Sequence, residues 1–171
     1  MQSDQKVAVV TGSSSGIGCE TALTLARNGF LTYATMRNLS KSDNIKSVTN
    51  KEKLPIRTNQ LDVTDDVSVN NAIRTIVSET GRIDVLVNNA GYGLVRAFED
   101  LSIQEIKDLY ETNVFGVVRV TQAVLPTMRR QQSGIIGNVS SGLGFLVIQV
   151  VHLMLALSLH LKVYLNLFHM N

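Results

Sequence analysis

Residues 7–18 read V-A-V-V-T-G-S-S-S-G-I-G and predict a strand that passes through a glycine-rich turn into a helix. The first four residues are apolar and mostly β-branched, which is typical of a buried strand. Gly12 allows a sharp turn, Gly16 has no Cβ to hold a ligand away, and Gly18 allows close packing of helix and strand. Because a helix N-terminus presents free N–H groups, this shape suits a phosphate. The candidate binding residues of the turn are Gly12, Ser13, Ser14, Ser15, Gly16, Ile17 and Gly18.

The glycines have the spacing G-x-x-x-G-x-G, which taken alone also fits a glycine-rich turn with no ligand. The fuller pattern T-G-x-x-x-G-I-G, residues 11–18, resembles the cofactor loop of the short-chain dehydrogenase/reductase family. The resemblance implies an α/β, Rossmann-like fold: a doubly wound parallel sheet in three layers, with the strand order 3-2-1-4-5-6-7. It also implies an oxidoreductase that moves hydride between a nicotinamide coenzyme and the carbonyl or alcohol carbon of a small-molecule substrate.

Composition and charge restrict the other classes of function. The 171 residues suffice for one domain with a sizeable core. The formal net charge is only +2 and the basic residues are scattered, so a nucleic-acid partner is not expected. The single cysteine, Cys19, excludes a disulfide framework and is expected to be a packed thiol. No signal-peptide pattern precedes the first strand, which favours a cytoplasmic location.

The end of the second predicted strand indicates which coenzyme would bind. Residues 30–36, F-L-T-Y-A-T-M, read as this strand, and Arg37 and Asn38 follow it. In a dinucleotide-binding fold this position faces the adenine ribose, where an acidic residue would select NAD(H). No acidic residue lies nearby, and a guanidinium suits a 2′-phosphate, so the sequence favours NADP(H) over NAD(H). The alternative interpretation is a solvated arginine at a strand end.

Two further strand ends carry candidate cofactor residues. Residues 55–61 read as the third strand, and the resemblance places Asp62, with Val63 beside it, next to the adenine amino group. Thr64 is predicted to cap the following helix. The fourth strand, residues 84–87, runs into N-N-A-G, which matches the family pattern. Its small residues would let the backbone approach the coenzyme, and its asparagine amides would brace neighbouring loops. The candidates here are Asn88, Ala90 and Gly91.

The catalytic residues that the resemblance implies follow later in the chain. A capping box at residues 102–105 predicts a long helix that continues to about residue 130 and carries Asn113. In the family such an asparagine kinks the helix and holds a water of a proton relay; a satisfied core amide is the alternative. Residues 134–139 read as the fifth strand. The resemblance assigns Ser141, or else Ser140, to bind the substrate carbonyl oxygen.

The remaining catalytic pair of the family, a tyrosine with a lysine four residues later, is missing. In that pattern the ammonium lowers the pKa of the phenol and holds the nicotinamide ribose. The pair is expected about a dozen residues after Ser141, but residues 144–161 are 18 uncharged residues without a tyrosine. One explanation is a membrane anchor. The favoured explanation is a reading-frame shift soon after Gly144. A one-base offset permits a tyrosine codon across residues 153–154 and a lysine codon across residues 157–158.

The chain is therefore expected to divide into a partial coenzyme-binding domain, residues 1–144, and an aberrant apolar tail, residues 145–171. Without the tyrosine and lysine we expect impaired catalysis; a non-catalytic nucleotide-binding fragment and a tail-anchored membrane protein are the alternatives. The family is usually homo-oligomeric, but part of that interface is missing here, which predicts poor solubility. No metal site is expected, because the histidines are irregularly spaced and lack acidic or thiolate companions.

Overall fold

The computed structural model describes residues 5–95 and 97–140, in which strands and helices alternate along the chain. The strands are β1 (Val7–Val10), β2 (Leu31–Met36), β3 (Ile56–Gln60), β4 (Val85–Asn88) and β5 (Ile135–Asn138). The helices are α1 (Gly16–Arg27), α2 (Asp43–Glu52), α3 (Asp66–Thr80), α4 (Ile103–Tyr110) and α5 (Gly116–Gln131). The shorter segments are the 3-10 turns η1 (Leu39–Lys41) and η2 (Phe98–Asp100) and the π-helical segment η3 (Glu111–Phe115). Ser141 and the tail at residues 145–171 lie outside the described residues.

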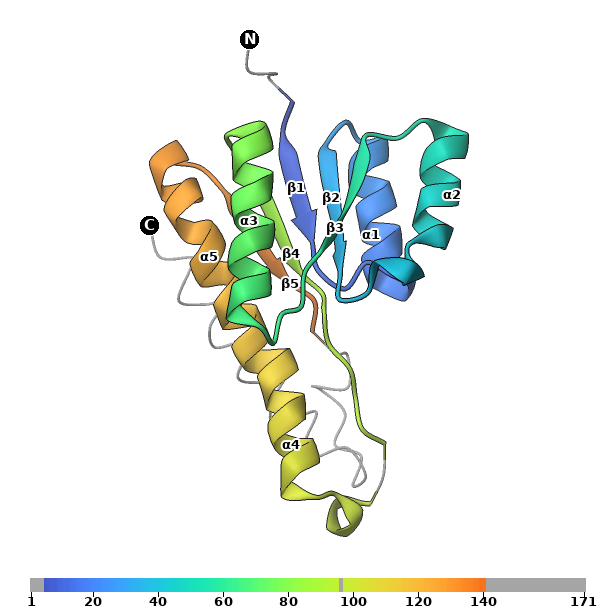
Figure 1. The fold of residues 1–171 in the computed structure, drawn as a ribbon, viewed down its shortest axis with the longest axis vertical. Coiled ribbons are helices and arrows are strands. Elements are labelled where there is room, and N and C mark those ends of the chain that lie inside the picture. Colours follow the sequence, from blue (N-terminus) through green and yellow to red (C-terminus); the bar gives the residue numbers. More distant parts are fainter. Residues whose placement is uncertain (1–4, 96, 141–171) are drawn as a thin grey trace.

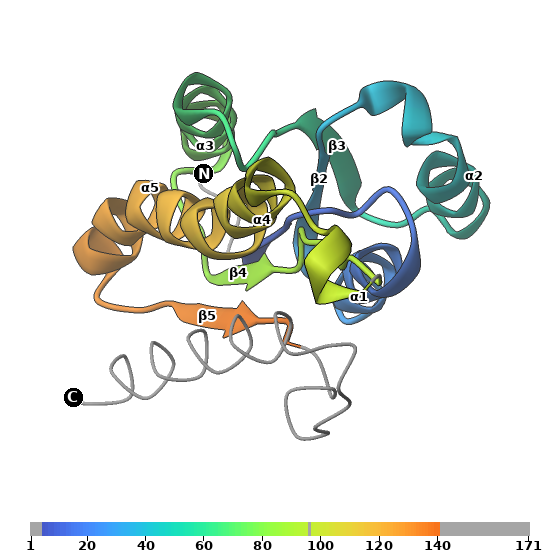
Figure 2. The same ribbon diagram turned by 90° about the horizontal axis from the view of Figure 1, so that it is seen from below.

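The five described strands form one parallel sheet in the order β3-β2-β1-β4-β5. Helices α1 and α2 cover one face of this sheet, and α3 and α5 cover the other (Figure 1, Figure 2). Residue Val10 of β1 pairs with Ala34 of β2 on one side and with Val87 of β4 on the other. Strands β2 and β3 are added on one side of β1, and the chain then crosses over to add β4 and β5 on its other side. Doubly wound folds bind ligands at this switch point, between β1 and β4. The predicted doubly wound fold is confirmed, and the described strands take the predicted order.

Alternation of side chains along β1 divides the core into two apolar clusters. Val9 packs on the face covered by α3 and α5, whereas Val10 packs on the face covered by α1 and α2. The predicted thiol, Cys19, is buried in the second cluster, and burial raises its pKa. Because both faces are covered, the central strands β1 and β4 are almost continuously apolar, as buried parallel strands usually are.

The start of α3 differs from the prediction in its capping residue. The side chain of Asp65, not Thr64, accepts hydrogen bonds from the N–H groups of Val67 (2.8 Å) and Ser68 (3.4 Å). Thr64 lies one residue before the cap position, and its own amide and hydroxyl both donate to Asp62 Oδ1, at 3.0 and 2.8 Å. Asp65 at this position also places negative charge at the positive end of the helix dipole.

The predicted long helix is divided by the π-helical segment η3 between α4 and α5. The capping box at its start is present: Ser102 Oγ accepts from the Glu105 N–H at 3.2 Å, and Glu105 Oε2 accepts from the Ser102 N–H at 2.9 Å. Helix α4 extends beyond the carboxyl ends of the strands (Figure 1). Within residues 5–95 and 97–140, no helix combines the length and apolar character needed to cross a bilayer.

Candidate functional site

The glycine-rich turn after β1 is folded tightly against the loop that follows β4. Gly12 has a φ of +67°, and a Cβ there would lie 2.7 Å from the Cα of Ala90, so only glycine fits. A Cβ on Gly18 would lie 2.5 Å from the Gly12 carbonyl oxygen and would overlap the Asn89 amide. Gly16 is different, because its φ is +58° but the space around its missing Cβ is open to 4 Å. The turn is therefore closed toward β4 and open at the start of α1.

Two residues that the sequence did not single out as cofactor ligands hold this turn in place. The Asn89 amide nitrogen donates to the carbonyl oxygens of Thr11 (2.9 Å) and Gly12 (3.1 Å). The hydroxyl of Thr11, itself buried, accepts from the backbone N–H groups of Asn89 and Ala90, both at 3.0 Å. The signal for Asn89 was its place in N-N-A-G, whose amides were expected to brace loops. The signal for Thr11 was its place at the start of T-G-x-x-x-G-I-G, to which no role was assigned.

The three serines of the turn have different surroundings. Ser13 is fully buried; its hydroxyl donates to the Val10 carbonyl at 2.8 Å and its N–H donates to the Thr35 carbonyl at 2.9 Å. Ser14 and Ser15 line an open cleft. Ser15 is the N-cap residue of α1, and its side chain makes no capping bond to this helix. The free N–H groups at the start of α1 are therefore accessible to an anion.

The cleft lies at the carboxyl ends of the strands, has a volume of about 1210 Å³ and is bounded by the loops after β1, β2, β3 and β4 and by the α4–α5 region. Most of the predicted site residues meet there, although they come from positions throughout the chain. The predicted residues that line it are Gly12, Ser14, Ser15, Ile17, Gly18, Arg37, Asp62, Val63, Asn88, Ala90, Gly91 and Asn113. Ser13, Gly16 and Asn38 are not among the lining residues, and Ser141 lies outside the described residues.

Arg37 and Asn38, at the end of β2, are placed differently with respect to the cleft. Arg37 is exposed and lines it, while its backbone carbonyl accepts from the Gln60 side-chain amide at 3.2 Å. Asn38 caps the turn η1, because its side-chain oxygen accepts from the Ser40 N–H at 2.9 Å. Arg37 therefore presents its positive charge to the cleft, whereas Asn38 stabilises the turn that follows β2.

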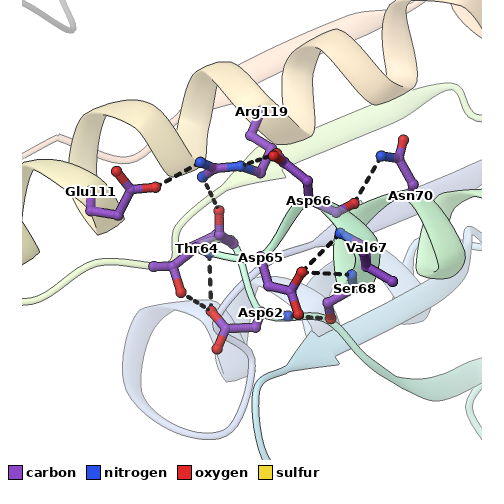
Figure 3. Close-up of polar contacts among 10 residues, drawn as sticks. Asp62, Thr64, Asp65, Asp66, Val67, Ser68, Asn70, Glu111 and Arg119 are labelled. Carbon is purple, nitrogen blue, oxygen red and sulfur yellow. Dashed lines mark hydrogen bonds and ion pairs between the residues drawn. The ribbon is translucent and has the colours of Figure 1, made fainter.

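Asp62 and Val63 form the wall of the cleft after β3. Figure 3 shows the bonds from Thr64 to the Asp62 carboxylate. Besides the bonds from Thr64, the Asp62 N–H donates to the Ser68 hydroxyl at 3.0 Å, which anchors the loop on the first turn of α3. The Val63 carbonyl accepts from Arg119 of α5 at 2.6 Å. These contacts hold a carboxylate and an apolar side chain side by side at the cleft, which is suited to an aromatic base with an exocyclic amino group.

Asn88 sits at the base of the cleft with 3% of its surface exposed. Its amide nitrogen donates to Asn138 Oδ1 at 2.8 Å and to the Thr121 hydroxyl at 3.1 Å. The side chain thus joins β4 to β5 and α5. Among the described residues, its buried Oδ1 has no hydrogen-bond partner.

Asn113 lies within the π-helical segment η3 and clasps the loop after β4. Its Oδ1 accepts from the Tyr92 N–H at 3.1 Å, and its Nδ2 donates to the Tyr92 carbonyl at 2.7 Å. Gly91 packs directly beside this amide, since a Cβ there would lie 3.1 Å from Asn113 Oδ1. Burial and the nearby charge of Asp108 raise the pKa of Tyr92, so its phenol is neutral at physiological pH. The Asn113 side chain thus accepts one hydrogen bond from Tyr92 and donates one to it, and no further bond of its second N–H is seen among the described residues.

Ser140 lines the cleft just after β5, whereas the first-choice serine, Ser141, falls outside the described residues. The apolar tail, and the codons that a one-base offset would read as tyrosine and lysine, fall outside them as well. The described part of the site is therefore a cleft lined by a glycine-rich turn at a helix N-terminus, a cation, a carboxylate and Asn113.

The family model described as short chain dehydrogenase matches residues 6–153. The chain is 42% identical over 136 residues to 3-ketodihydrosphingosine reductase of Bacteroides thetaiotaomicron, covering 80% of the chain and 47% of that protein. It is 41% identical over 145 residues to retinol dehydrogenase 8 of Bos taurus, covering 81% of the chain and 45% of that protein. The chain thus spans about half the length of these curated relatives.

Solved structures show the same architecture. A gluconate 5-dehydrogenase from Burkholderia cenocepacia in complex with NADP and tartrate superposes with a TM-score of 0.86 at 28% identity, covering 94% of the chain and 63% of that structure. An alcohol dehydrogenase from the archaeon Thermococcus sibiricus, complexed with 5-hydroxy-NADP, gives a TM-score of 0.87 at 28% identity, covering 96% of the chain and 70% of that structure.

Proposed function

Because the chain belongs to the short-chain dehydrogenase family, we propose that it binds NADP(H) in the cleft and forms part of an oxidoreductase. The reaction class is hydride transfer between nicotinamide and the carbonyl or alcohol carbon of a small-molecule substrate. When bound, the coenzyme supplies or accepts the hydride. The chain's own residues bind the coenzyme, orient it and exclude water from the cleft.

The observation that carries the coenzyme proposal is the position of Arg37. It lines the cleft at the end of β2, the strand directly beside β1, whose turn would hold the diphosphate, and no acidic side chain stands in its place. A planar guanidinium can bind a phosphate through two parallel hydrogen bonds, so a 2′-phosphate on the adenine ribose is favoured here. Two structurally similar enzymes whose descriptions include NADP or an NADP derivative support the same preference.

The remaining cleft residues fit the other parts of a dinucleotide. The open space at Gly16 and the free N–H groups at the start of α1 suit the diphosphate. The loop with Asp62 and Val63 suits the adenine ring. Asn113 is proposed to hold a water for proton transfer through its remaining N–H, and Ser141 is proposed to orient the substrate oxygen.

We also propose that the chain as given turns over slowly. None of its four tyrosines is followed by a lysine four residues later. Loss of general acid–base catalysis alone lowers rates by about 100- to 10,000-fold. The absence of the motif favours a second candidate function, a non-catalytic nucleotide-binding chain. A reading-frame shift remains our proposed cause, and the DNA sequence of codons 140–171 tests it: the proposal fails if no single insertion or deletion restores the motif.

Coenzyme titrations test the binding proposal. We expect NADPH, followed by its nicotinamide fluorescence, to bind at least about tenfold more tightly than NADH. Arg37→Ala should abolish this preference by weakening NADPH binding alone. Arg74→Ala removes an exposed arginine from α3 and serves as the matched control, which should keep the preference. Equal affinities for the two coenzymes in the unmodified chain, or binding of neither, would refute the proposal.

A further inference from the structure

Arg119 of α5 makes three polar contacts, two of them with the cleft-lining residues Val63 and Glu111 and one with Asp66 (Figure 3). Its guanidinium donates to the Val63 carbonyl at 2.6 Å, to Glu111 Oε1 at 2.6 Å and to Asp66 Oδ1 at 2.5 Å. The three acceptors come from the loop after β3, from the first residue of η3 and from the first turn of α3. One side chain therefore connects the segment between β3 and α3 to the distant segment η3.

A second feature of α5 reinforces the contact with Val63. Gly116 lies three residues before Arg119 on the same helix, so both face the same side. A Cβ on Gly116 would lie 2.8 Å from Val63 Cγ2 and 2.9 Å from its Cβ. The helix can approach Val63 this closely only because Gly116 has no side chain. Val63 is thus held through its side chain by one residue and through its carbonyl by the other.

The contacts of Arg119 differ in what they contribute. Asp66 is 77% exposed, and ion pairs of this kind contribute little to stability because water and salt screen them. The Arg119 side chain is only 19% exposed, and its bonds to the Val63 carbonyl and to Glu111 are better shielded from water. Burial lowers the pKa of Arg119, but the hydrogen bonds to Glu111 and Asp66 outweigh this and raise it, so the group stays charged. Any influence of Arg119 on the positions of neighbouring segments should therefore act mainly through Val63 and Glu111.

Both of these partners lead directly into the cleft. Val63 belongs to the wall with Asp62, whose carboxylate holds the Thr64 N–H. Glu111 opens the π-helical segment that carries Asn113, and Asn113 clasps the backbone of Tyr92 on the opposite loop. A continuous series of contacts thus runs from the loop after β3, through Arg119, to the loop after β4.

We propose that Arg119 is a positioning residue that sets the spacing between the loop at residues 61–64 and the π-helical segment Glu111–Phe115. Through this spacing it links the adenine side of the cleft to the position of Asn113 and Tyr92. The consequence for coenzyme binding rests on the proposed function, whereas the mechanical link does not. A planar fork with several donors is required, because one ammonium cannot reach all three acceptors in the same geometry.

The link is tested by amide hydrogen exchange in the chain without coenzyme. Arg119→Gln is expected to speed exchange of the Thr64 and Tyr92 amides together, by about tenfold each. Neither amide bonds Arg119, and they belong to different loops. Arg119→Lys should give intermediate acceleration at both. The control is Ile76→Ala, which removes a fully buried side chain from α3 and lowers global stability without touching the cleft.

If Arg119 contributed only to global stability, Arg119→Gln and an equally destabilised Ile76→Ala would show the same exchange rates at the Thr64 and Tyr92 amides. That result would overturn the inference. If Arg119→Gln does not fold, Glu111→Gln replaces it: Tyr92 exchange should accelerate more than Thr64 exchange, and equal or absent changes overturn the link.

NADPH titration then measures the consequence for binding, with an expected rise in Kd of about tenfold for Arg119→Gln over Ile76→Ala. Failure of the unmodified chain to bind NADPH refutes the proposed function, and the exchange experiment still decides the role of Arg119.

Discussion

The side chain of Asn113 pairs with both backbone polar groups of Tyr92, accepting from its N–H at 3.1 Å and donating to its carbonyl at 2.7 Å. This two-point contact crosses 21 positions of sequence and joins the π-helical segment to the loop after β4. An amide is well suited to this task, because it presents one acceptor and one donor in a single plane. The contact makes Asn113 a structural element of the cleft wall, whatever further part it has in proton transfer.

Replacing Asn113 by aspartate should open this wall. The carboxylate could still accept from the Tyr92 N–H, but it would face the Tyr92 carbonyl with negative charge in place of a donor. We expect a loss of about 1–3 kcal/mol in the free energy of unfolding, measured by urea denaturation, and weaker NADPH binding. Asn71→Asp, at an exposed position of α3, is the matched control. Unchanged stability in Asn113→Asp would show that the clasp contributes nothing.

Thr11 offers a test of the contact between the glycine-rich turn and the loop after β4. Thr11→Val keeps the shape of the buried side chain but leaves the N–H groups of Asn89 and Ala90 without their acceptor. We expect a loss of about 2–4 kcal/mol in unfolding free energy, since each unpaired buried group costs about 1–3 kcal/mol. Thr11→Ser retains the hydroxyl and should lose about 1 kcal/mol through the missing methyl group. Equal losses in the two variants would contradict this account.

Gly12 and Gly16 should respond differently to the same substitution. Gly12→Ala places a Cβ 2.7 Å from the Ala90 backbone, which cannot move aside as a side chain could, so we expect stability to fall by several kcal/mol. Gly16→Ala strains a positive φ but meets no neighbour within 4 Å, so about 1 kcal/mol is expected. Thermal unfolding compares the two variants. A larger loss in Gly16→Ala would show that the packing of the turn has been misassigned.

Tyr33 should make stability depend on pH in the alkaline range. Its phenol donates to Glu79 Oε2 at 2.5 Å and accepts from Arg57 at 3.1 Å. Burial, followed by the bond to Glu79, raises the pKa of Tyr33 to about 12, above the value of about 10 expected in the unfolded chain. The contribution of this group to stability is therefore complete below pH of about 10 and is lost as the pH rises toward about 12.

The test of this pH dependence is the urea midpoint across the alkaline range for the unmodified chain and for Tyr33→Phe. The difference between the two curves should shrink or change sign above pH of about 10, because only the unmodified chain carries a phenol that loses its proton more readily when unfolded than when folded. Curves that stay parallel would mean that Tyr33 does not titrate differently in the folded state.

Several features were predictable from local chemistry alone. The β-branched run at β1, the turn at Gly12 and the capping box at residues 102–105 depend on residues close together in the chain. Their preferences act before any tertiary contact forms. The choice of Thr64 as a helix cap was wrong, because α3 begins one residue later: Asp65 occupies the cap position, and Thr64 donates to Asp62 instead.

Other features depend on residues that only folding brings together. Asn89 was recognisable as part of a motif, but its bond to Thr11 crosses 78 positions of sequence. Arg119 reaches the Val63 carbonyl across 56 positions and carried no signal of its own. No periodicity or spacing rule specifies contacts of this range, since they depend on how α5 packs over the sheet.

Amino-acid order was therefore enough to establish the strand–turn–helix unit, the alternation of elements and the residue types gathered at the strand ends, because steric and hydrogen-bonding preferences over a few neighbours govern all three. Packing of the sheet and helices settled which amide meets which carbonyl. The parallel register of Val10 against Val87 brings Thr11 to Asn89, and the approach of α5 to Val63 brings Arg119 to Glu111 and Asp66. Those distances follow from close packing over the whole core, which no short stretch of chain encodes.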